Sequence, residues 1–215
     1  MGKILGLFVM DVDSTLVKEE VIDLLAQEAG FGKEVAQITE LAMNGHLDFE
    51  AALKERVALL EGLPLSIFDK VYQSIHFNSG AQELVNQLHD QQYKVGLVSG
   101  GFHETVVRLA DELGIDYVHA NQLANKDGKL TGELEGPIVT KEVKLQKLQD
   151  WALENNLNLS QTVAMGDGAN DLPMIKAAGI GIAFCAKPIV QNQALYQIDV
   201  PNLMEALTII NKERG

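Results

Sequence analysis

The chain has 215 residues, of which 47% are hydrophobic and 22% charged, and its formal net charge is −13. This composition excludes a disordered chain, and the excess of acidic residues argues against broad binding to nucleic acids or anionic membranes. The single cysteine, Cys185, excludes a disulfide framework, so we expect a buried free thiol in a reducing compartment. No apolar run approaches the roughly 20 residues that a membrane helix requires, and we expect a cytoplasmic protein.

The first predicted element is a strand over residues 4–10, which form a short and nearly continuous apolar run. From residue 20 to about residue 75 the apolar residues instead follow a helical period, in stripes that end near residues 30, 45 and 62. No strand pattern interrupts this block. We therefore predict an all-helical insertion over residues 16–75.

Beyond residue 76, helical and extended patterns alternate, which is typical of an α/β fold with a parallel sheet. We predict helices over 81–91, 104–113, 141–154, 171–178 and 203–210, and strands over 94–98, 117–120, 162–165 and 180–184. A hairpin turn is predicted at 125–128, with Gly128 at a positive φ. The predicted fold is a Rossmann-like α/β core of residues 1–15 and 76–215, with residues 16–75 as a small helical cap inserted after the first strand.

Polar clusters follow three of the predicted strands, at residues 11–15, 99–101 and 166–171. Ligands of an open parallel sheet bind beyond the carboxyl ends of its strands, so we expect these clusters to converge.

Four acidic side chains come to this edge of the sheet: Asp11, Asp13, Asp167 and Asp171. Neighbouring buried carboxylates repel one another unless a cation lies between them. Mg²⁺ suits these acids, because it is a hard cation that takes carboxylates, waters and phosphate oxygens as ligands. The loop pattern of a calcium site is absent, and too few histidines or thiols lie nearby for zinc.

The neighbouring residues favour a phosphate as the remaining ligand. Ser14, Ser99 and the backbone N–H groups of the two glycines after Ser99 are suitable oxyanion donors. Lys144 adds a cation in the first turns of the helix over 141–154, on its apolar stripe, where a positive charge opposes the helix macrodipole. Lys141 is a rival from the same turn, and spacing alone does not decide between the two lysines.

These motifs resemble those of the haloacid-dehalogenase-like (HAD) superfamily and, within it, the phosphoserine phosphatase family. The resemblance spans essentially the whole chain and is carried by D-V-D-S-T-L-V at residues 11–17, S-G-G-F at 99–102, Lys144 and G-D-G-A-N-D at 166–171. It implies Mg²⁺-dependent hydrolysis of O-phosphoserine through an aspartyl phosphate, as the last step of serine biosynthesis. The expected partner is this small molecule, with no nucleic acid or membrane, and the oligomeric state stays open between monomer and homodimer.

The resemblance also implies a role for each site residue. Asp11 is the nucleophile, and Asp13 protonates the leaving group and later activates water. Asp11, the Asp13 backbone carbonyl and Asp167 hold Mg²⁺, with Ser14 and Asp171 around these ligands. The residues that bind the phosphoryl group are Ser99, Gly100, Lys144 and Asn170.

Substrate selectivity is expected in the cap. Arg56 lies on the apolar stripe of the third cap helix, where an unpaired buried guanidinium is unfavourable. In the resembling family Arg56 binds the substrate carboxylate and Glu20 its ammonium, while Met43 and Phe49 close the pocket. Judged by residue type alone, Glu20 is an ordinary acid in a first helical turn.

Other functions stay open at this point. A phosphotransferase that passes the phosphoryl group to an alcohol, or a phosphatase for another small phosphoester, needs the same residues. A receiver-like signalling module also combines acids, Mg²⁺, a hydroxyl and a lysine. The helical block after the first strand and the second acid, Asp13, argue against a receiver.

Overall fold

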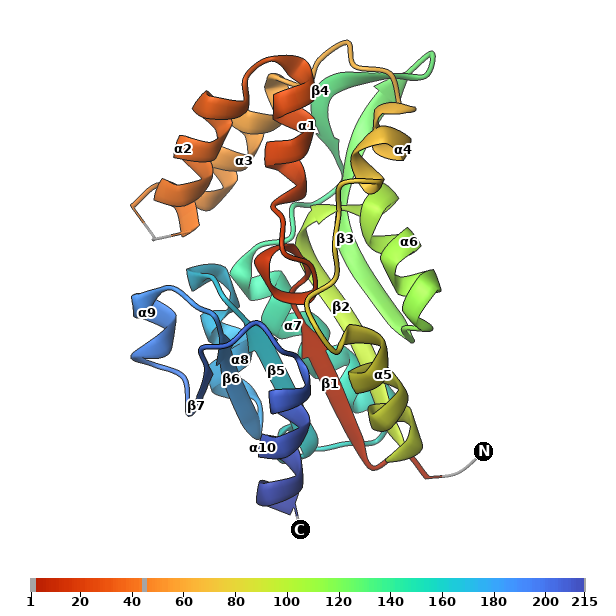
Figure 1. The fold of residues 1–215 in the computed structure, drawn as a ribbon, viewed down its shortest axis with the longest axis vertical. Coiled ribbons are helices and arrows are strands. Elements are labelled where there is room, and N and C mark those ends of the chain that lie inside the picture. Colours follow the sequence, from red (N-terminus) through yellow and green to blue (C-terminus); the bar gives the residue numbers. More distant parts are fainter. Residues whose placement is uncertain (1–2, 44–45, 215) are drawn as a thin grey trace.

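The computed structural model describes residues 3–43 and 46–214, and a seven-stranded sheet runs through the larger part of the molecule (Figure 1). The strands are β1 (Gly6–Met10), β2 (Tyr93–Phe102), β3 (Tyr117–Lys126), β4 (Lys129–Glu135), β5 (Thr162–Gly166), β6 (Ile180–Phe184) and β7 (Tyr196–Ile198). Their order in the sheet is β4-β3-β2-β1-β5-β6-β7. Neighbouring strands run parallel except β3 and β4, which are antiparallel. The predicted α/β class is confirmed.

Helices cover both faces of the sheet. They are α5 (Ala81–Asp90), α6 (His103–Leu113), α7 (Lys141–Glu154), α8 (Leu172–Ala177), α9 (Pro188–Gln191) and α10 (Met204–Arg214). In the central strand β1, Phe8 and Met10 pack in the cluster that α5, α6 and α10 cover, whereas Leu7 and Val9 pack with α7 and α8. Burial on both faces is the reason why this strand is a continuous apolar run rather than an alternating one.

Four helices form a second layer above the carboxyl end of β1 (Figure 1). These cap helices are α1 (Val21–Ala29), α2 (Gly32–Met43), α3 (Phe49–Ala58) and α4 (Ile67–Tyr72). Leu25 and Leu53 belong to their hydrophobic cluster, which also includes Leu123 and Leu130 of the β3–β4 hairpin. Leu130 exchanges backbone hydrogen bonds of 2.8 and 2.9 Å with the loop after α3. The cap therefore shares its core with residues outside 16–75, and the predicted domain boundaries stay a prediction.

The β3–β4 hairpin turns where the sequence indicates. Asp127 and Gly128 have positive φ values of 52° and 77°, which a two-residue turn of the type that matches strand twist requires.

The cap joins the core through two neighbouring segments. Val17 and Phe77 pair as an antiparallel bridge. The buried Asn78 donates its backbone N–H to Leu16 O at 2.9 Å and its Nδ2 to Thr15 O at 2.8 Å. Asn78 thus fixes both segments to each other immediately after the 11–15 cluster.

Some details differ from the sequence predictions. The strand β2 continues through Ser99 to Phe102 rather than ending at residue 98. The elements α9 and β7 were not expected, because four and three residues are too few to show a period.

Cys185 is exposed, so the expected buried thiol is wrong. Cys185 directly follows β6 and has a φ of 43°.

No helix among residues 3–43 and 46–214 combines the length and the apolar character that crossing a membrane demands.

Asp116 connects α5, β2 and the start of β3. Its carboxylate accepts hydrogen bonds from Lys94 Nζ, from the Val95 N–H at 2.9 Å and from His89 Nε2 at 2.9 Å. Burial would raise the pKa of Asp116, but the hydrogen bonds from Lys94, Val95 and His89 outweigh it and lower this pKa below its ordinary value. The charged form is therefore stabilised by folding.

We expect Asp116→Asn to lower the free energy of unfolding at pH 7 by about 1.5–3 kcal/mol, since hydrogen bonds to a charged acceptor are lost. Because folding lowers the pKa of Asp116, its contribution is complete above the ordinary carboxyl pKa of about 4 and is lost as the pH falls below it. Urea unfolding should show a constant difference between the two proteins from pH 7 to about pH 5, and convergence as the pH falls below about 4. Asp150→Asn, at a surface pair of 3.8 Å, is the control; an equal loss at pH 7 in both variants would contradict the assignment.

Candidate active site

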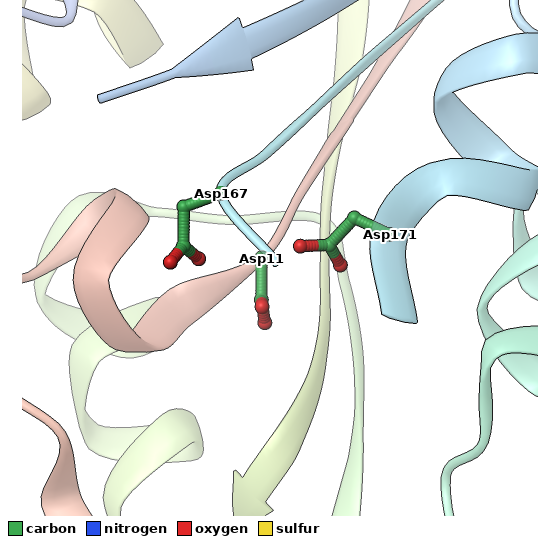
Figure 2. A group of neighbouring side chains, drawn as sticks. All are labelled: Asp11, Asp167 and Asp171. Carbon is green, nitrogen blue, oxygen red and sulfur yellow. The ribbon is translucent and has the colours of Figure 1, made fainter. Parts of the chain in front are cut away.

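Three carboxylates from different elements meet beyond the carboxyl ends of the central strands, as predicted. Asp11 follows β1, Asp167 follows β5, and Asp171 immediately precedes α8. One oxygen of each lies within 4.8 Å of the others, and all three residues are buried. Figure 2 shows their carboxyl groups gathered at the end of the sheet.

Lys144 provides the positive charge of this cluster. Its Nζ lies 2.8 Å from Asp11 Oδ1 and 2.7 Å from Asp171 Oδ1, and its side chain is 0% exposed. Burial would lower the pKa of Lys144, but the charges of Asp11 and Asp171 outweigh it and raise this pKa. The side chain of Lys141 is 59% exposed and lies beside Glu142. The structure thus places Lys144, and not Lys141, at the cluster.

One lysine does not balance the buried acids. Burial and then the charge of Asp11 raise the pKa of Asp171 to about 7, although Lys144 and the Gly168 N–H bind its carboxylate. The pKa of Asp167 is also raised well above its usual range by burial and by the charges around it. An all-oxygen, electron-rich donor set with excess negative charge fits a hard divalent cation.

Asp13 lies in the tight turn after β1, beside the end of β2. A Cβ at Gly101 would lie 2.7 Å from Asp13 Oδ2 and 3.0 Å from Ser99 Oγ, so only glycine permits this approach. The other oxygen, Asp13 Oδ1, is buried and has no hydrogen-bond partner among the described residues. Burial, followed by the charges of Glu20 and Asp11, raises the pKa of Asp13 well above its usual range.

The same turn contacts the cap. Ser14 has a φ of 56°, and its Oγ donates a hydrogen bond of 2.5 Å to Glu20 Oε1. Glu20 directly precedes α1, and burial is the main reason why its pKa rises to about 7. The strained turn therefore brings one cap carboxyl group to the core site.

The end of β2 is held by a residue that sequence reasoning missed. The Gly101 N–H donates to Ser99 Oγ at 2.8 Å. The buried Asn121 donates its Nδ2 to Gly100 O and accepts from the Val139 N–H, both at 2.8 Å. An asparagine directly after the predicted strand over 117–120 is the sequence signal for this role, and it is too weak to single out Asn121.

Arg56 enters the site from the cap. It is buried, and its Nε and Nη1 donate to Ala52 O at 3.1 Å and to Thr39 Oγ1 at 2.8 Å. Among the described residues, no carboxylate forms an ion pair with this guanidinium. A buried cation with this arrangement favours an anionic ligand.

A cavity of about 20 Å³ lies between the core residues and the cap residues of the site. Asn170 lines it, and Asn170 Oδ1 is buried and has no hydrogen-bond partner in the described part of the chain. Its lining residues are Asp11, Asp13, Glu20, Ile22, Leu53, Arg56, Ser99, Gly100, Gly101, Phe102 and Asn170. Lys144, Asp167 and Asp171 lie in the cluster around Asp11, and Ser14 lies beside Glu20. The side chains of Met43 and Phe49 lie outside what the structure describes.

Comparisons with known proteins agree with this geometry. A model of the haloacid dehalogenase-like hydrolase family matches residues 8–176. The chain is 68% identical to the phosphoserine phosphatase of Streptococcus thermophilus over 212 residues, 99% of either chain. A solved phospho-aspartyl intermediate analogue of phosphoserine phosphatase has a TM-score of 0.93 and 45% identity, covering 96% of this chain and 99% of that one. A substrate-bound phosphoserine phosphatase has a TM-score of 0.93 and 44% identity, covering 97% and 99%.

We expect Lys144→Met to lower the free energy of unfolding by about 3–5 kcal/mol, because it leaves two buried carboxylates without their counter-charge. Urea unfolding at pH 8 in the presence of a chelator measures this, because no added cation then compensates for the missing charge. Lys147→Met, three residues along the same helix at a partly exposed pair, should change stability by less than about 0.5 kcal/mol. Equal losses in both variants would contradict a special role for Lys144.

Proposed function

The chain belongs to the haloacid dehalogenase-like hydrolase family, and we propose that it is a phosphoserine phosphatase, which converts O-phosphoserine and water into serine and phosphate. The cavity between core and cap carries this proposal. Its core wall presents Asp11 and Asp13, and its cap wall presents the buried Arg56 together with Glu20. A phosphoester that also bears a carboxylate and an ammonium complements both walls.

Asp11 is the proposed nucleophile. Its Oδ1 is held by Lys144 Nζ and by the Val12 N–H, both at 2.8 Å, which leaves Oδ2 to attack phosphorus. A bond forms between Oδ2 and phosphorus, and the bond from phosphorus to the serine oxygen breaks. The serine oxygen takes a proton from Asp13, whose buried carboxyl group has a pKa well above its usual range.

The second half of the reaction uses the same two residues. Asp13, now a carboxylate, accepts a proton from the water that attacks phosphorus. The bond between phosphorus and Asp11 Oδ2 breaks, phosphate leaves, and Asp11 returns to its carboxylate form. Asp13 ends the cycle protonated, so atoms and charge balance.

Mg²⁺ is the proposed cofactor, because the cluster offers oxygen ligands and one lysine for several acids. Asp11, the Asp13 carbonyl and Asp167 would hold it, with Ser14 and Asp171 around them. When bound, the ion neutralises the phosphoryl oxygens and the attacking carboxylate, so that their mutual repulsion falls.

The remaining site residues are proposed to bind substrate. Ser99, Gly100, Lys144 and Asn170 hold the phosphoryl oxygens on the core side. Residues 16–75 act as the cap, in which Arg56 binds the carboxylate, Glu20 binds the ammonium, and Met43 and Phe49 close the pocket. A reducing, cytoplasmic location suits the single, unpaired cysteine.

We expect the purified chain to release phosphate from O-phosphoserine with Mg²⁺ and to stop when the metal is chelated. Asp11→Asn should reduce turnover to background while still binding substrate, because the amide cannot form the aspartyl phosphate. A panel of phosphoserine, phosphothreonine, phosphoethanolamine and phosphoglycolate tests the substrate, with phosphate release as the measurement. A faster reaction with another member, or full activity of Asp11→Asn, would overturn the proposal.

We expect Arg56→Ala to lower kcat/KM for phosphoserine by roughly 30-fold to several-thousand-fold, since truncating one partner of a desolvated charge pair costs about 2–5 kcal/mol. Phosphoethanolamine lacks the carboxylate, so its slower turnover should change little. Arg56→Lys should restore only part of the loss, because a point charge does not reproduce bidentate geometry. Equal losses on both substrates would mean that Arg56 supports the cap fold instead.

A further inference from the structure

We infer that Thr39 and Asp23 are positioning residues that aim the guanidinium of Arg56 into the cavity and so set the preference for a substrate carboxylate. This inference rests on the proposed function and deepens it. The observation behind it is a chain of hydrogen bonds that links three cap helices and ends at Arg56.

Arg56 keeps part of its donor capacity for a ligand. A guanidinium has five N–H groups, and two of them are used, by Ala52 O within the same helix and by Thr39 Oγ1 from α2. The described residues offer no hydrogen-bond acceptor to the N–H groups of Nη2. Because Arg56 lines the cavity, the two N–H groups of Nη2 and the second N–H of Nη1 are left for a planar carboxylate.

Thr39 is buried on α2 and makes two hydrogen bonds with one oxygen. Its hydroxyl donates to Asp23 Oδ1 at 3.0 Å and accepts from Arg56 Nη1 at 2.8 Å. A hydroxyl has a single hydrogen. Donation to Asp23 therefore turns the oxygen lone pairs of Thr39 toward Arg56 and fixes where Nη1 lies.

The threonine also keeps a carboxylate away from the arginine. Asp23 and Arg56 form no ion pair in the structure, although both contact Thr39. With direct contact, the carboxylate of Asp23 would occupy the fork of the guanidinium and compete with the substrate. One interposed hydroxyl lets Asp23 offset part of the buried charge from a distance while the donors of Arg56 stay directed to the cavity. A threonine between an aspartate and an arginine is thus a spacer as well as a support.

The test compares Thr39→Val, which keeps the shape and removes the hydroxyl, with Thr39→Ser, which keeps the hydroxyl. We expect Thr39→Val to lower kcat/KM for phosphoserine by about 10- to 100-fold, mainly through KM, in line with the loss of a hydrogen bond to a charged group. Turnover of phosphoethanolamine should stay within about threefold. Thr39→Ser should match the wild-type enzyme on both substrates.

Two further variants separate positioning from support of the fold. Asp23→Asn should shift selectivity in the same direction as Thr39→Val. The control Asp69→Asn, in α4 at an exposed pair with Arg108 of α6, should not. In an Arg56→Ala background, Thr39→Val should have no additional effect on phosphoserine, because the two residues act as one unit. Equal losses on both substrates in Thr39→Val, or an undiminished loss in the Arg56→Ala background, would overturn the inference.

The proposed function is judged separately, by the wild-type enzyme and Arg56→Ala. If wild type hydrolyses phosphoserine and Arg56→Ala loses that substrate selectively, an unchanged Thr39→Val overturns the positioning role alone. If wild type does not hydrolyse phosphoserine, the proposed function and the inference both fail.

Discussion

The charge of Lys144, buried between Asp11 and Asp171, is the interaction on which the site depends. Parallel strands deliver several carboxylates to one edge of the sheet, and three of them lie within 4.8 Å of one another. Without a buried cation these groups would resist ionisation, and Asp11 would lose its value as a nucleophile. One lysine offsets only part of the negative charge. The remaining excess of buried negative charge destabilises the fold and favours the binding of a divalent ion. Binding of such an ion should therefore also stabilise the folded protein.

The α/β core and the helical cap contribute different residues to the site. The core holds the proposed reacting groups at strand ends and in the turn after β1. Asn78 hydrogen-bonds to Thr15 O and Leu16 O of this turn, where the cap begins. The cap brings Arg56 and Glu20 over the same cavity. A cavity of about 20 Å³ has room for about one water molecule, far less than an amino-acid phosphate needs. The cap connects to the core at the paired segments of Val17 and Phe77 and also contacts the β3–β4 hairpin.

The fold and the central acids could be predicted because each depends on local sequence. The apolar run before Asp11 indicates a strand buried on both faces, and motif spacing carries the acids to its end. The choice between Lys141 and Lys144 could not be made from spacing, since both lie in one turn. The burial of Lys144 and Leu148 in the structure decides for Lys144 and agrees with its place on the apolar stripe of the helix. Asn121 and Thr39 were missed because they act through a backbone group or another side chain, and such roles leave no motif.

The division of charge between Lys144 and Arg56 explains how so acidic a protein binds an anionic substrate. A net charge of −13 repels a phosphate dianion at long range. Affinity must therefore come from cations that act at short range, where the low dielectric of a buried site strengthens them. Lys144 is already paired with Asp11 and Asp171, so part of its charge is balanced within the protein. Arg56 forms no ion pair with a described residue, so under the proposed function its charge is available to the substrate. The proposed function thus assigns substrate recognition mainly to the cap and stabilisation of the transition state mainly to the core.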